Sequence, residues 1–276
     1  STELLIPPPE VAAGAGGAGQ TTFGVRIDSV TPDDLSQPRI YSLQKLVEVA
    51  DLNMGVRPRL VLGNIWRQMS YIFSSSGCHE NQSVAMYAID SLKQLSLKFL
   101  RTEELRDFSC QRLFLSPFET ILTKCKDPTV KELIVNCISN IVLARVDNIK
   151  SGWKTLFACF ALAANDRQKE VWQPALAAVK QVLEAHFERV LPDLSEAIKA
   201  ISAFTNATHL PEETTAESLD LLKFCIQKIS ETAGDSSGKY KFSDSEADMM
   251  LWWPVLTRLA ELVGDSRPHV RERALE

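Results

Sequence analysis

The sequence lacks any long hydrophobic run. Its longest apolar stretch, residues 133–144, is interrupted by Asn136, Ser139 and Asn140, whereas a membrane-spanning helix needs ~18 apolar residues. The first residues show neither the basic segment nor the hydrophobic segment of a secretory signal. No run of β-branched residues alternates with polar ones, so no strand is predicted. We therefore expect a soluble, helical protein of the cytoplasm.

Motifs of catalysis and metal binding are also missing. There is no P-loop, HExxH, GxSxG or kinase catalytic-loop pattern, and the four histidines are scattered. None of the six cysteines has CxxC spacing, so we expect reduced core thiols rather than disulfides or zinc ligands. Gly14, Gly16 and Gly19 match GxGxxG, but no strand precedes them, and a linker is the better interpretation. We expect no cofactor, no metal and no enzymatic activity in this chain.

Positive charge is not in excess. Lys and Arg number 30 against 35 Asp and Glu, so the net charge is −5. Because nucleic-acid-binding proteins usually present a basic surface, this balance argues against nucleic acid as a partner. With 276 residues, 45% of them hydrophobic, the chain is long enough to bury a large core.

What the chain does contain is the period of the amphipathic helix. Residues 127–165 read as two such helices joined by the polar turn Arg145–Gly152, and each has an apolar face that it cannot bury alone. Helix starts of one type are predicted near residues 81, 128, 168, 214 and 268, at intervals of 47, 40, 46 and 54 residues. Hairpins of about 40–47 residues are the repeat unit of the HEAT and armadillo classes.

The predicted fold is therefore an all-α, HEAT/armadillo-like helical-hairpin solenoid. Residues 1–30, rich in Gly and Pro, are predicted to be a flexible linker. Residues 31–276 are predicted to be the repeat region, part of a longer array, with a helix start at Thr31-Pro-Asp-Asp34. We expect most of the five tryptophans in the core. One of Trp252 and Trp253 should be partly exposed, because neighbours on a helix point about 100° apart.

Basic residues form three local sets. They are Arg145, Lys150 and Lys154 around the turn before Trp153; Arg57, Arg59 and Arg67; and Lys93, Lys98 and Arg101. Solvated helix faces are the simple interpretation. The alternative is a surface for an acidic partner or for anionic lipid headgroups.

Four blocks of sequence, in order, resemble one family. They are residues 38–48, 88–100, 114–119 and, most specifically, Asn148-Ile-Lys-Ser-Gly-Trp-Lys154. Over residues 30–276 the chain is similar to the large Arf-activating exchange factors of the Golgi, the Sec-seven/BIG family of brefeldin-A-inhibited guanine-nucleotide exchange proteins. There these blocks lie downstream of the catalytic domain. The sequence departs from the family at Pro58, Gly63 and Trp172-Gln-Pro174, where the helices of the relatives are more continuous. We therefore expect a helix break at Trp172-Gln-Pro174.

The resemblance implies a non-catalytic regulatory or scaffolding segment of a trans-Golgi Arf exchange factor, cytoplasmic and peripheral on the membrane. The implied partners are Arf-family small GTPases, other domains of the parent exchange factor and an anionic membrane surface. The partner-binding residues expected at the turn are Arg145, Asn148, Lys150, Ser151, Gly152 and Lys154. Lys150 and Lys154 would meet acidic groups, and Gly152 would permit close approach. The alternative is that this turn only sets the angle between two helices.

Two other function classes compete with this interpretation. A generic armadillo or HEAT adaptor for extended peptides would need a regular ladder of Trp and Asn, and Trp153 has no counterpart one repeat away. An enzyme with an unrecognised site would need clustered catalytic residue types, which the chain does not show.

Overall fold

The computed structural model describes residues 40–104, 108–233 and 246–275. The chain divides into two units, residues 1–37 and 38–276, and the described residues belong to the second. Their regular structure is helical throughout. The helices are α1 (Tyr41–Val56), α2 (Arg59–Gly77), α3 (Gln82–Phe99), α4 (Cys110–Lys124), α5 (Pro128–Arg145), α6 (Gly152–Ala164), α7 (Lys169–Val190), α8 (Leu194–Asn206), α9 (Glu212–Ala233), α10 (Glu246–Val263) and α11 (Pro268–Leu275), with 3-10 turns η2 (Val146–Asn148) and η3 (Leu191–Asp193). The predicted linker and the helix start at Thr31 lie outside the described residues.

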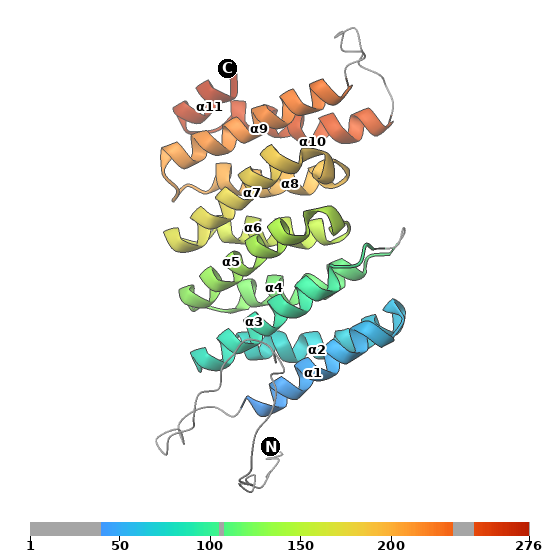
Figure 1. The fold of residues 1–276 in the computed structure, drawn as a ribbon. Coiled ribbons are helices and arrows are strands. Elements are labelled where there is room, and N and C mark those ends of the chain that lie inside the picture. Colours follow the sequence, from blue (N-terminus) through green and yellow to red (C-terminus); the bar gives the residue numbers. More distant parts are fainter. Residues whose placement is uncertain (1–39, 105–107, 234–245, 276) are drawn as a thin grey trace, which may run out of the picture. The chain divides into compact units, whose positions relative to one another are not determined.

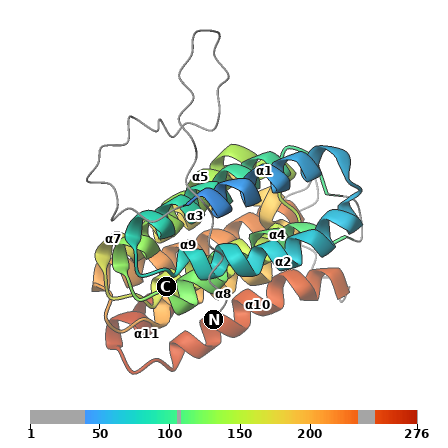
Figure 2. The same cartoon turned by 90° about the horizontal axis from the view of Figure 1, so that it is seen from below.

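The helices stack in two layers. Consecutive helices run back and forth as hairpins, so the odd-numbered helices α1 to α11 lie side by side in one layer and the even-numbered helices α2 to α10 in the other (Figure 1). Figure 2, which looks along the stack, separates α1, α3 and α5 from α2, α4 and α10. The predicted all-α helical solenoid is confirmed for the described part of the chain.

The sequence sets the starts of α3 and α5 through local capping. Asn81 accepts a hydrogen bond from the Ser83 amide at 3.0 Å, and Asp127 accepts one from the Thr129 amide at 2.9 Å. Pro128 follows at the first helical position, where its missing N–H costs nothing. The predicted starts near 81, 128, 168, 214 and 268 are confirmed to within two residues by α3, α5, α7, α9 and α11.

Proline affects the helix boundaries unevenly. Pro58 lies between α1 and α2 and separates them, whereas Gly63 continues α2 without a break. The break expected at Trp172-Gln-Pro174 is wrong, because α7 runs through Pro174. Proline has a helical φ and removes here only the bond to the Glu170 carbonyl, in the exposed first turn of the helix. The non-helical backbone of α7 lies at His186 instead (φ −138°, ψ 34°).

The hydrophobic core runs continuously between the two layers. Trp66 of α2 stacks on Phe114 of α4 with ring centroids 3.8 Å apart, and Phe99 of α3 stacks on the same ring at 4.1 Å. Because three helices from two hairpins share these rings, neighbouring repeats bury one another's apolar faces. Among the described helices, none has both the length and the apolar composition needed to cross a bilayer.

The tryptophans and cysteines follow the expected pattern. Trp66, Trp153, Trp172 and Trp252 are buried, and Trp253 is 66% exposed, which confirms the prediction for the adjacent pair. All six cysteines are free thiols, and three of them are fully packed in the core. Burial raises the pKa of the Cys137 thiol to about 11 and that of Cys225 to about 12, so neither is a reactive thiolate near neutral pH.

Candidate functional site

The candidate residues lie where the helical hairpins turn. Because every odd-numbered helix runs in one direction and its partner returns, the turns of successive hairpins lie along a single edge of the stack, at the right in Figure 1. We call this the turn edge and define it by residues 57–58, 100–104, 146–151 and 191–193. The predicted site, from Arg145 to Lys154, occupies its middle.

Asn148 joins this turn to the preceding hairpin. Its side-chain amide donates to the backbone carbonyls of Leu100 at 2.8 Å and Arg101 at 3.1 Å, just past the end of α3. Carbonyls at a helix C-terminus have no partner within the helix, so this amide satisfies groups that would otherwise need water. The backbone carbonyl of Asn148 in turn accepts from Gln111 Nε2 at 2.7 Å. The Asn148 side chain is therefore engaged within the chain.

Two buried polar side chains of the preceding hairpin hold the rest of the turn. Gln111 Oε1 accepts from the backbone amides of Lys150 at 2.8 Å and Gly152 at 3.3 Å. The carboxylate of Glu104 accepts from the Ser151 amide and hydroxyl, both at 3.0 Å, and from the Gln111 amide at 2.8 Å. We call Glu104, Gln111, Asn148, Ser151 and Gly152 the turn clamp.

The turn clamp explains how a carboxylate can be buried in this fold. Glu104 is only 3% exposed, and Gln111 is fully buried. A buried carboxylate is costly unless hydrogen bonds replace its hydration, and the three donors to Glu104 supply that replacement. The two bonds from Ser151 cross from the start of α6 to the α3–α4 connection, and the bond from the Gln111 amide anchors Glu104 within its own hairpin. The clamp therefore fixes the position of one hairpin on the next.

Gly152 is the first residue of α6 and lies against α4. A Cβ atom at this position would come within 3.1 Å of Leu115 Cδ1 and 3.2 Å of Gln111 Oε1. Only a glycine lets the helix start approach α4 so closely without displacing these side chains. Trp153, next in sequence, is buried and stacks on Phe157 with centroids 5.4 Å apart, as expected of a core anchor.

The basic members of the predicted site are more accessible. The half-buried Arg145 donates from Nε to the Leu97 carbonyl at 3.0 Å. Lys150 and Lys154 are exposed, and each lies beside a carboxylate: Lys150 Nζ is 2.7 Å from Glu103, and Lys154 Nζ is 3.9 Å from Glu196. Lys150 holds the pKa of the Glu103 carboxyl below its usual value. Exposed ion pairs of this kind are weak and exchange readily with other partners.

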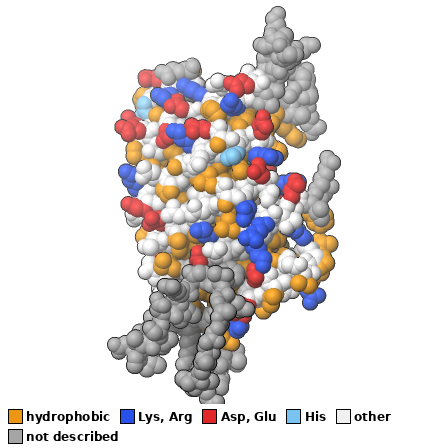
Figure 3. Space-filling model, in the orientation of Figure 1, with side chains coloured by type: hydrophobic (Ala, Val, Ile, Leu, Met, Phe, Trp, Pro, Cys, Tyr) orange, Lys and Arg blue, Asp and Glu red, His pale blue; other side chains and the backbone are white. Residues whose placement is uncertain are grey.

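The other two basic sets are each divided by the fold. Arg57 and Arg59 meet Lys98 and Arg101 around a cavity of about 210 Å³ between the ends of α1 and α3 and the start of α2. Arg67 and Lys93 do not line it. Figure 3 shows Lys and Arg side chains gathered in the right-hand half of the face, between α1 and α5.

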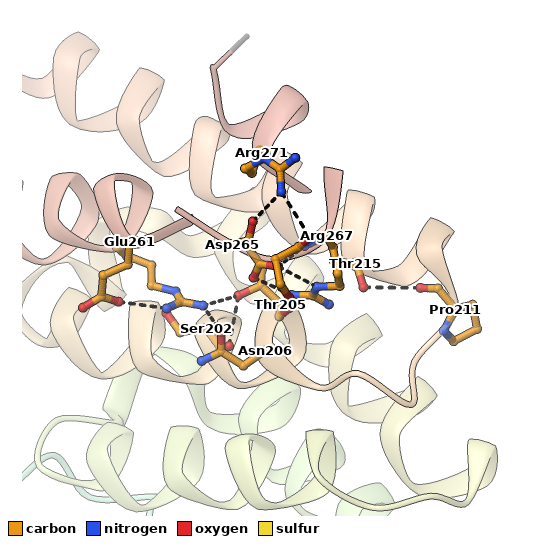
Figure 4. Close-up of polar contacts among 11 residues, drawn as sticks. Ser202, Thr205, Asn206, Pro211, Thr215, Glu261, Asp265, Arg267 and Arg271 are labelled. Atoms are coloured by element: carbon orange, nitrogen blue, oxygen red, sulfur yellow. Dashed lines mark hydrogen bonds and ion pairs between the residues drawn. The ribbon is translucent and has the colours of Figure 1, made fainter. Parts of the chain in front are cut away.

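A second polar cluster, at the opposite edge, ties the last helices to α8. Arg267 donates to the Thr205 carbonyl at 2.5 Å and to both carboxylate oxygens of Asp265 (Figure 4). Arg258 donates to the Thr205 hydroxyl at 2.9 Å and to the Asn206 side chain. The Arg267 guanidinium and amide lower the pKa of Asp265 to about 2. Like the turn clamp, this cluster joins consecutive repeats.

Sequence reasoning missed Glu104, Gln111, Asp265 and Arg267. Each stands in a polar stretch without a motif and resembles a solvated loop or helix residue. The roles of Glu104, Gln111 and Arg267 become visible only in the structure, because each has a hydrogen-bond partner more than 30 residues away in sequence. Among the described residues, no group of three His, Cys, Asp or Glu side chains is placed to hold a metal ion.

Comparison with known proteins gives a consistent result. A family profile described as Mon2/Sec7/BIG1-like, HDS matches residues 98–181. The chain is 35% identical over 271 residues to brefeldin A-inhibited guanine nucleotide-exchange protein 3 of Arabidopsis thaliana, covering 90% of this chain and 15% of that protein. It is also 35% identical over 264 residues to brefeldin A-inhibited guanine nucleotide-exchange protein 1 of Homo sapiens, covering 90% of this chain and 14% of that protein. The chain thus spans about 15% of the length of such relatives.

Proposed function

This chain belongs to the family of brefeldin A-inhibited guanine nucleotide-exchange proteins (the BIG family), as a region of such a protein, and we propose that it is a non-catalytic scaffold that regulates Arf activation within its parent exchange factor. In this proposal it acts in the cytoplasm, peripherally at trans-Golgi membranes, in vesicle-mediated transport. The observation that carries the proposal is the match along 90% of the chain to guanine nucleotide-exchange proteins. The profile match, residues 98–181, contains the whole turn clamp.

The turn edge is the surface that we propose meets the partner. The turn clamp holds the backbone of residues 148–152 in place, so the neighbouring Lys150 and Lys154 project from a rigid support. A preorganised pair of cations loses little freedom when it binds an acidic surface. The partners proposed are an Arf-family small GTPase, another domain of the parent exchange factor and an anionic membrane.

Flotation with vesicles tests this function. The purified chain is mixed with phosphatidylcholine vesicles that carry a membrane-anchored Arf-family GTPase loaded with GTP or with GDP. Recruitment that depends on GTP supports a module that reads the activated GTPase. Equal recruitment by the GTP-loaded and the GDP-loaded protein would count against recognition of the nucleotide state of the GTPase. No recruitment would favour contact with other domains of the parent chain.

A charge reversal locates the surface. Lys150→Glu with Lys154→Glu should abolish recruitment if the turn edge is the contact. The matched control is Lys124→Glu with Lys126→Glu, which changes two exposed lysines at the end of α4 and in the α4–α5 connection, at the opposite edge. If the first double variant stays folded and is recruited like the wild type, the turn edge is not the binding surface.

The alternative, a generic armadillo or HEAT adaptor for extended peptides, is less favoured by the burial of the tryptophans. Peptide-binding ladders need aromatic side chains on the surface, and four of the five are in the core. Trp253 alone does not make a ladder.

A further inference from the structure

We propose that the cavity formed by Arg57, Arg59, Lys98 and Arg101 is a binding site for the phosphate monoester of a lipid headgroup. We call this cavity the arginine pocket. It extends the proposed function, in which the chain works at a membrane, by naming a ligand and the residues that bind it. The four cations come from three different segments: the end of α1, the start of α2 and the end of α3. The fold brings them together although Arg57 and Arg101 are far apart in sequence.

The charges of the arginine pocket are mostly not neutralised within the chain. Asp51 lies 2.5 Å from Lys98 and balances that cation. The nearby Glu103 pairs with Lys150 instead. Arg57 reaches the neutral amide of Asn53 at 3.4 Å, and Arg101 has no side-chain partner among the described residues. Three arginines without a carboxylate partner therefore surround one small cavity, which favours an anion.

Arg59 is held ready to bind. Its guanidinium lies over the Phe99 ring, 4.5 Å from the centroid, and its Nη2 donates to the Thr102 carbonyl at 3.3 Å. Its Nη1 makes no hydrogen bond to any described residue although it is buried. A buried donor without a partner is unfavourable, and an anionic oxygen would satisfy it. The stacking fixes the guanidinium plane, so its remaining N–H groups are already oriented.

The size and chemistry of the arginine pocket point to a tetrahedral oxyanion. Its volume of about 210 Å³ is below the ~300 Å³ at the lower end for sites of drug-sized molecules, so the bound group must be small. The planar fork of arginine matches the oxygens of phosphate better than the point charge of lysine. A phosphate monoester also carries more negative charge than a diester or a carboxylate, which suits three arginines.

The surroundings of the pocket favour a lipid as the source of the phosphate. Val56 and Leu60 flank Arg57-Pro58-Arg59, and their side chains are 79% and 65% exposed. Exposed apolar residues alternating with arginines at the tip of a hairpin are suited to the boundary between headgroups and acyl chains. The apolar side chains would enter the bilayer surface while the arginines take the headgroup.

The test is flotation of the whole chain with two kinds of phosphatidylcholine vesicle. One contains a phosphatidylinositol monophosphate, and the other contains phosphatidylserine at the same total negative charge. We expect at least about tenfold stronger binding to the monophosphate vesicles, the effect of a single charge-assisted hydrogen bond at the lower end of its range. Equal binding to both kinds of vesicle would overturn the proposal, because binding would then depend only on the total negative charge of the membrane.

Three variants make the result specific. Gly55 lines the cavity in α1, and a Cβ added there meets nothing within 4 Å. Gly55→Leu should therefore fill the pocket without removing a charge or weakening the helix, and should abolish the preference for the monophosphate. Arg59→Lys keeps the charge but loses the fork and should do the same. Arg67→Gln, an exposed arginine of α2 outside the pocket, is the control and should bind like the wild type.

The remaining outcomes separate the sources. Soluble inositol bisphosphate should release the protein from monophosphate vesicles, and Leu60→Ser should weaken flotation without altering that competition. If Leu60→Ser floats like the wild type, the apolar contact with the bilayer is wrong. If the wild type does not float with the monophosphate vesicles but binds soluble inositol bisphosphate, the lipid source is wrong and a soluble phosphate ester is the ligand. If Gly55→Leu folds, as judged by circular dichroism, and keeps its preference, the pocket is not the site. GTP-dependent recruitment on pure phosphatidylcholine vesicles is independent of these results, so this proposal and the proposed function can fail separately.

Discussion

Replacing Gln111 should uncouple one hairpin from the next. Its side chain makes three hydrogen bonds across the α4–α6 boundary, two as acceptor and one as donor. Gln111→Met keeps most of the volume and removes all three. At about 1 kcal/mol net for each bond, the loss is about 3 kcal/mol, since the amides of Lys150 and Gly152 and the carbonyl of Asn148 lose their partners.

The assay is amide hydrogen exchange, because a repeat array can open locally without unfolding as a whole. Exchange in residues 146–156 should accelerate on the order of 100-fold in the variant, which corresponds to about 3 kcal/mol at 1.4 kcal/mol per tenfold. Exchange in α9, two repeats away, should be unchanged. The matched control is Gln94→Met, an exposed glutamine of α3. An acceleration below about fivefold, equivalent to less than 1 kcal/mol, would refute the reasoning and mean that water replaces these bonds at little cost.

Two further predictions concern the packing and the charges of the repeats. Gly152→Ala should lower the stability by about 1–2 kcal/mol, because the added Cβ would press on Leu115 and Gln111. Gly63→Ala, whose Cβ would meet only Leu113 at 3.9 Å, should be neutral or stabilising by up to about 1 kcal/mol. Thermal unfolding of both variants tests this, and equal melting temperatures would contradict it. Because the pKa of Asp265 is lowered to about 2, below the ~3.9 of an unfolded chain, its stabilising effect is full above about pH 4 and is lost as the pH falls towards 2. In urea unfolding at pH 7, Asp265→Asn should therefore have a lower free energy of unfolding than the wild type, and this difference should vanish near pH 2. A difference that persists at low pH would show that the charge of Asp265 is not the cause.

The fold was predictable because its information is local and periodic. Capping residues such as Asn81 and Asp127 mark helix starts, and the apolar stripes of α5 and α6 mark a hairpin that needs neighbours. The intervals between starts then predict the repeat class. The error at Trp172-Gln-Pro174 has a local cause as well: proline was read as a helix breaker, although the lost hydrogen bond lies in an exposed first turn.

The candidate site was predictable only in part. The turn Asn148–Lys154 stood out by its resemblance, and Trp153 lies in the core, as was expected of most of the tryptophans. The sequence did not predict that Asn148, Ser151 and Gly152 contact their own chain while Lys150 and Lys154 stay exposed. Whether these lysines bind a partner stays a prediction for the flotation experiment to decide.

The sequence by itself determined the helices, their repeat period, their apolar faces and the family, because each depends on residues close together along the chain or on matched blocks in order. The tertiary structure decided which polar groups are buried and which cations share a cavity. Glu104 meets Ser151 and Arg59 meets Phe99 only when hairpins stack, and the energies of burial and charge depend on distance in space rather than in sequence. Two arginines can therefore look alike in the sequence, as Arg59 and Arg67 do, and differ completely in what surrounds them.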